Sequence, residues 1–147
     1  MKTGDSRFGI DANVILRYLL TDSQDLSPKA ISIFEALQDG QIEVYCDPVT
    51  LSEVVWVLTS FYGLGREQIG SRVGDLIKAE GFRVPDKAVY VQALELYSGP
   101  VPNYGDACAC AAALQECGGR LLSFDQALSR VEGITRAETP PLGEGAE

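Results

Sequence analysis

Short apolar runs alternate with longer amphipathic segments along this chain, and this alternation limits the possible folds more than any other feature. The runs at residues 8–10, 42–46 and 120–123 have the length of strands, and residues 82–84 form a shorter extended piece. The segments between them carry apolar residues at helical spacing. Strands that alternate with helices indicate an α/β architecture with a mostly parallel sheet between helical layers.

Start and stop residues divide the helical segments. Ser27 and Pro28 have the pattern of an N-cap and a first helical residue, and Gly40 ends the helix that they predict. Thr50 and Glu53 match a capping box at the start of another helix. The segment 106–117 is rich in alanine and cysteine, small residues that allow a helix to lie close against a sheet.

The length of 147 residues fits a single domain, which we expect over residues 1–138 with a flexible tail at 139–147. No apolar run approaches the roughly 18 residues of a membrane span, and the first residues lack the apolar stretch of a signal peptide. The sequence therefore predicts a cytoplasmic protein without membrane contact, whose four cysteines are reduced thiols.

The charge balance and the absence of histidine exclude several kinds of chemistry. The net charge is −9, from 21 acids against 12 bases, which opposes binding of a polyanion and suits binding of a cation. Any nucleic acid would need a bound metal ion or a local cluster of bases. Because the chain has no histidine, it cannot form a histidine-dependent triad or a histidine-based zinc site.

Four acids stand where a parallel sheet would bring them to one edge. Asp11 and Asp125 follow predicted strands, Asp106 begins a helix, and Glu53 lies in the first turns of another. Sites in such sheets form beyond the carboxyl ends of the strands. Each acid also has a local explanation: Asp11 and Asp125 as N-caps, Asp106 as a favourable charge at a helix start, and Glu53 in the capping box.

Carboxylates that come together repel one another unless a proton or a cation intervenes. Hard divalent ions such as Mg²⁺ bind carboxylates, water and phosphate oxygens. A bound metal ion lowers the pKa of a water ligand and neutralises charge on a phosphate group. The acids therefore suit metal-assisted hydrolysis of phosphodiester bonds.

Four motifs in order resemble PIN-domain proteins of the VapC toxin group. They are FGIDANVILRYL at residues 8–19, LSEVVWVL at 51–58, NYGDA at 103–107 and LSFD at 122–125. The resemblance runs from about residue 8 to residue 136. It implies a three-layer α/β/α fold and endoribonuclease activity that depends on Mg²⁺ or Mn²⁺. It also implies the toxin of a type II toxin–antitoxin pair, a homodimer, and an antitoxin whose basic side chains fill the acidic cleft.

The resemblance assigns roles to individual residues. Four acids would be catalytic and would line the metal site: Asp11, Glu53, Asp106 and Asp125. Asn13 and Ser123 match polar positions beside these acids. Apart from the resemblance, Arg17 is a candidate for contact with phosphate, and the alternative is a solvated or salt-bridged arginine. The chain departs from the family at Ala12, where Ser or Thr is common, and at Asn103, where Asp is frequent. These departures leave the four acids in place.

Two other functions compete with the ribonuclease. Phosphatases of the haloacid dehalogenase type also carry an Asp after the first strand, but they use a second Asp two residues later, where this chain has Asn13. A non-catalytic binding module on the same fold is the third hypothesis, and the intact acids argue against it. The RNA target depends on loop shape and unpaired bases, which the sequence does not specify.

Overall fold

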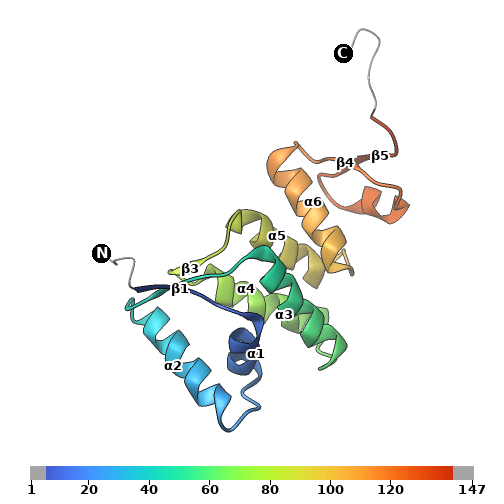
Figure 1. Ribbon diagram of the computed structural model, residues 1–147. Coiled ribbons are helices and arrows are strands. Elements are labelled where there is room, and N and C mark those ends of the chain that lie inside the picture. Colours follow the sequence, from blue (N-terminus) through green and yellow to red (C-terminus); the bar gives the residue numbers. More distant parts are fainter. Residues whose placement is uncertain (1–5, 141–147) are drawn as a thin grey trace.

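The computed structural model describes residues 6–140 and has an α/β fold (Figure 1). Its strands are β1 (Arg7–Gly9), β2 (Glu43–Tyr45), β3 (Phe82–Arg83), β4 (Arg120–Leu122) and β5 (Thr135–Ala137). Its helices are α1 (Ala12–Leu20), α2 (Leu26–Gln38), α3 (Pro48–Ser60), α4 (Arg66–Lys78), α5 (Lys87–Ser98), α6 (Tyr104–Glu116) and the short 3-10 helix η2 (Gln126–Arg130). Most of the predicted tail, residues 141–147, lies outside the described residues.

The strands pair in parallel, as the sequence predicts, but they form two sheets and not one. The first sheet has the order β1-β2-β3, with Phe8 opposite Val44 and Val44 opposite Phe82. The second contains β4 and β5, which also run parallel. The parallel α/β class is therefore confirmed. The strands are divided between two sheets because no described strand joins β1 to β4.

One continuous apolar core includes buried side chains from α1 through η2. Its largest fully buried side chains include Ile15, Leu51, Leu58, Ile69, Ile77, Phe82 and Leu94. Helix α1 packs on α2, α4 packs on α5, and α5 packs on α6. Helix α6 leads away from the first sheet and carries β4 and β5 at its far end (Figure 1). Within the described residues, no helix has the length and apolarity to cross a membrane.

Two helices begin earlier than the sequence predicts. Helix α2 begins at Leu26, so Ser27 lies inside it, where its buried hydroxyl donates to the Arg17 carbonyl at 2.8 Å. Helix α3 begins at Pro48, with Asp47 as its N-cap. The predicted capping box at Thr50 is therefore wrong, because Thr50 already donates its amide to Asp47 at 2.9 Å.

Candidate acidic site

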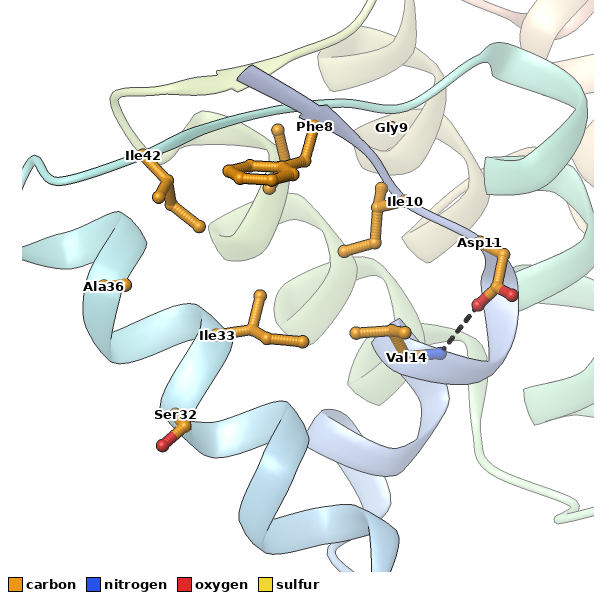
Figure 2. Close-up of a pocket in the computed structure, with 10 residues that line it drawn as sticks. Phe8, Gly9, Ile10, Asp11, Val14, Ser32, Ile33, Ala36 and Ile42 are labelled. Atoms are coloured by element: carbon orange, nitrogen blue, oxygen red, sulfur yellow. Dashed lines mark hydrogen bonds between the residues drawn. The ribbon is translucent and has the colours of Figure 1, made fainter. Parts of the chain in front are cut away.

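Asp11 follows β1 and begins α1. Its Oδ1 accepts a hydrogen bond from the Val14 amide at 3.2 Å, which makes Asp11 the N-cap of α1 (Figure 2). The side chain is exposed, and Oδ2 lies outside the capping bond. The predicted cap is thus present, and it occupies one carboxylate oxygen. The other oxygen is available to a ligand.

Glu53 lies on the exposed side of α3, away from the stripe of Leu51, Val54 and Val55 that enters the core. Because Asp47 caps this helix, the start of α3 does not need the Glu53 carboxylate. A hollow of about 280 Å³ between α3 and the start of α6 is lined by Ser52 and Gly105, among other residues. The structure therefore brings the second and third sequence motifs side by side.

Asp106 and Asp125 both act on the buried thiol of Cys110. Burial is the main reason that the pKa of Cys110 is raised, and the negative charges of Asp106 and Asp125 raise it further. Asp106 lies in the first turn of α6, which Asn103 caps by accepting the Asp106 amide at 2.9 Å. Asp106 and Asp125 therefore both lie within electrostatic range of Cys110.

Asp125 is held by its neighbours. Its Oδ1 accepts from the Ala127 amide at 3.0 Å, which begins η2, and its own amide donates to the Ser123 hydroxyl at 3.0 Å. Arg136 donates to the Ser123 carbonyl at 2.7 Å and thereby ties β5 to this turn. Sequence reasoning missed Arg136, since it lies in a polar segment without a motif. Ser123 supports the Asp125 loop.

Arg17 forms a salt bridge and does not point freely to solvent. Its Nη1 lies 2.7 Å from Oδ1 of Asp22, and its Nη2 donates to the Tyr62 hydroxyl at 3.2 Å. The hydrogen bond to Tyr62 and the charge of Asp22 raise the pKa of Arg17, while partial burial opposes this shift. Of the two roles considered for Arg17, the structure shows the salt bridge. Asn13 is exposed in the first turn of α1.

Asp47 is a further acid at a strand end that sequence reasoning did not single out. It follows β2 as Asp11 follows β1, but both of its carboxylate oxygens are bound. Oδ1 accepts from the Thr50 amide at 2.9 Å and Oδ2 from the Thr50 hydroxyl at 2.8 Å. These hydrogen bonds lower the pKa of Asp47. Asp47 is therefore a structural cap and differs from Asp11.

The acids of one chain do not form a metal site as they stand. Among residues 6–140, no three Cys, Asp or Glu side chains lie close enough together to hold a metal ion. The donor types suit a hard divalent cation, but their arrangement within one chain does not. The roles of Asp11, Glu53, Asp106 and Asp125 stay predictions.

A model of the PIN domain family matches residues 9–134, which is most of the chain and includes all four acids. The chain therefore belongs to the PIN domain family. PIN domains are generally nucleases, with nucleic acid as their substrate, and they typically use a divalent metal ion. Neither the curated proteins nor the solved structures gave a match to this chain.

Proposed function

We propose that this protein is a metal-dependent endoribonuclease and acts as the toxin of a type II toxin–antitoxin pair. The observation that carries this proposal is the family match over residues 9–134, which spans the four acids in order. Family membership also argues against the haloacid dehalogenase alternative. The proposal includes Mg²⁺ or Mn²⁺ as the cofactor and RNA as the substrate.

We also propose a basic protein partner. Asp11 and Glu53 are both exposed acids, which suits an antitoxin that presents Lys or Arg side chains, because opposite charges speed and direct association. The proposal also includes a homodimer in the cytoplasm. A net charge of −9 favours basic protein partners over free nucleic acid.

Cleavage of a mixed RNA pool tests the activity, with Mg²⁺, Mn²⁺ or EDTA, for the wild type and for Asp11→Asn and Asp106→Asn. Asn caps a helix about as well as Asp, so Asp11→Asn removes the charge and keeps α1. We expect metal-dependent cuts that each substitution slows by roughly 100-fold or more, the scale of losing one charge-stabilising group.

Asp47→Asn is the matched control, because Asp47 also follows a strand and caps a helix but has both oxygens bound to Thr50. It should keep the wild-type cleavage rate. Equal loss in Asp47→Asn and Asp11→Asn would assign the effect to helix capping and contradict the proposed role of Asp11.

A non-catalytic binding module is the second candidate, and one observation favours it: no three acids come together in the described part of a single chain. In that case folded, antitoxin-free protein would bind RNA or a protein partner without cutting RNA under any metal condition. The same cleavage assay therefore separates the two functions.

A further inference from the structure

The two sheets each end in a strand with an open edge. The Ile10 amide donates to the Tyr45 carbonyl at 3.1 Å, so β1 uses alternate backbone groups toward β2. The backbone N–H and C=O of Gly9, which lies between Phe8 and Ile10, face away from β2. In β4 the Ser123 amide donates to the Ala137 carbonyl at 3.1 Å, which leaves the backbone of Leu122 on the edge away from β5. Open edges of this kind accept another strand.

Large apolar side chains stand in solvent beside both edges. Phe8 in β1 is 50% exposed, while Leu122 in β4 and Phe124 after it are 60% and 82% exposed. Beside β1 lies a hollow of about 590 Å³ with a largely apolar lining (Figure 2). Its lining includes Phe8 of β1, Ile10 just after β1, Ile33 and Ala36 of α2, and Ile42 just before β2. Apolar surface of this kind marks a contact site.

Helix α6 holds β4 of the same chain away from β1. The rings of Tyr97 and Tyr104 meet edge to face, with centroids 5.7 Å apart, and Ala107 and Ala111 are fully buried. Figure 1 shows β4 and β5 beyond the far end of α6, apart from β1. Moving β4 to β1 within one chain would disrupt the packing of α6 on α5. A second copy can supply the strand without that disruption.

We propose that two copies of this chain pair reciprocally, with β4 of each copy adding in parallel to the open edge of β1 in the other. Leu122 and Phe124 of one copy then cover the apolar hollow beside β1 of the other. A reciprocal exchange pairs the β1 and β4 edges of both copies in a closed two-fold dimer and leaves neither of these edges open to a third copy.

This pairing also supplies an acid to the candidate site, a part that rests on the proposed nuclease function. Asp11 lies just beyond the end of β1, and Asp125 lies just beyond the end of β4. In parallel strands these ends meet at the same edge of the sheet. The pairing therefore brings Asp125 of one copy toward Asp11 of the other, and it accounts for the incomplete acid cluster in one chain.

Sedimentation velocity at micromolar concentration tests the pairing without reference to activity. We expect the wild type to be a dimer. Leu122→Pro removes the amide on the open edge and spares the β4–β5 hydrogen bonds, so it should sediment as a monomer. Leu122→Val keeps that amide and should remain a dimer.

Because proline can disturb folding, Phe124→Ser provides a second variant at an exposed position, and it should weaken dimerisation at least about tenfold.

A monomeric wild type would overturn the pairing, and so would a folded dimer that neither Leu122→Pro nor Phe124→Ser weakens. In the first case β4 joins β1 of its own chain or remains apart from it. In the second case another face forms the dimer.

Mixed variants test the shared site. Asp11→Asn and Asp125→Asn chains, refolded together, should regain about a quarter of the wild-type rate, because about half of the dimers are mixed and each mixed dimer has one intact site. Asp11→Asn mixed with Glu53→Gln is the control and should regain nothing, since both acids come from the same copy. No recovery in the first mixture, from an active wild type, would overturn the shared site. An inactive wild type that still dimerises would overturn the proposed function alone.

Discussion

The aspartates at the strand ends show how hydrogen bonding decides what a carboxylate can do. Asp47 has both oxygens bound to Thr50, whereas Asp11 uses one oxygen for the Val14 amide and Asp125 one for the Ala127 amide. A carboxylate whose oxygens are both engaged has less capacity for a further ligand. The three residues have similar sequence surroundings, so only the structure separates the structural acid from the two with a remaining oxygen.

Cys46 precedes Asp47, and its thiol makes the free energy of unfolding depend on pH in the alkaline range. Burial raises the pKa of its thiol to about 11, and the charge of Asp47 adds to the shift. An unfolded cysteine loses its proton near pH 8.5, as a rough reference value. The protonated thiol therefore stabilises the fold below about pH 8.5, and this contribution is lost as pH rises from there toward 11.

We expect the free energy of unfolding to fall between about pH 8.5 and 10.5 in the wild type and to fall less in Cys46→Ala. Urea unfolding across this range measures both slopes. The pKa of nearby Tyr104 is also raised, mainly by burial and last by the charge of Cys46, so the difference reports Cys46 together with its small effect on Tyr104. Cys117→Ser, at an exposed position, should keep the wild-type slope. Identical slopes in wild type and Cys46→Ala would contradict the argument.

At the scale of helices and strands, the sequence predicts which elements exist better than where they begin. The apolar spacing correctly indicated the helices, because burial of one face requires it. The predicted starts of α2 and α3 are wrong, although Ser27 and Thr50 are good N-caps in isolation. In the structure the Ser27 hydroxyl donates to the Arg17 carbonyl, and the Thr50 hydroxyl donates to Asp47. Strand β5 went unpredicted because its sequence, Thr135–Ala137, contains no apolar run.

The contact between α4 and α5 depends on a glycine that sequence periodicity does not explain. A Cβ at Gly70 would overlap the Ser98 hydroxyl and lie 3.0 Å from the Leu94 carbonyl oxygen. The Ser98 hydroxyl donates to that same carbonyl at 2.8 Å, so a new methyl group would have to displace it. The helices are therefore packed too closely at this point for any side chain.

We expect Gly70→Ala to lower the free energy of unfolding by roughly 1–2 kcal/mol, because overpacking outweighs the better helix propensity of alanine. Gly74→Ala in the same helix is the matched control. A Cβ there meets no atom within 4 Å, so this change should raise stability by about 0.5–1 kcal/mol. Chemical denaturation measures both. Stabilisation by Gly70→Ala equal to that by Gly74→Ala would show that α4 and α5 separate easily.

At the scale of the whole molecule, the parallel strands could be predicted but their division into two sheets could not. Alternating strands and helices indicate parallel pairing, yet the pattern does not say which strands become neighbours. The exposed faces of β1 and β4 carry Phe8 and Leu122, residues that sequence patterns assign to a core. The four candidate acids could likewise be named from the sequence, whereas the sequence does not say where β4 lies relative to β1.

The net charge of −9 leads to a prediction about RNA binding. Several arginines are paired with neighbouring acids: Arg7 and Arg83 share Glu43, Arg17 pairs with Asp22, and Arg136 pairs with Glu138. These pairs, together with the net charge of −9, weaken the positive field that could replace the counterions of a phosphate backbone. Affinity that comes from such replacement falls with salt in proportion to the number of phosphates contacted.

In EDTA, which prevents cleavage, we expect RNA affinity to depend weakly on KCl, with a log–log slope shallower than about −3. Fluorescence anisotropy of a labelled RNA between roughly 50 and 200 mM salt measures this slope. Adding Mg²⁺ should tighten binding, because metal ions at the acids reverse the local sign of the field. A slope steeper than about −6 would instead indicate a basic surface large enough to bind RNA alone. The acids would then serve cleavage only, and metal ions would not be needed to hold the substrate.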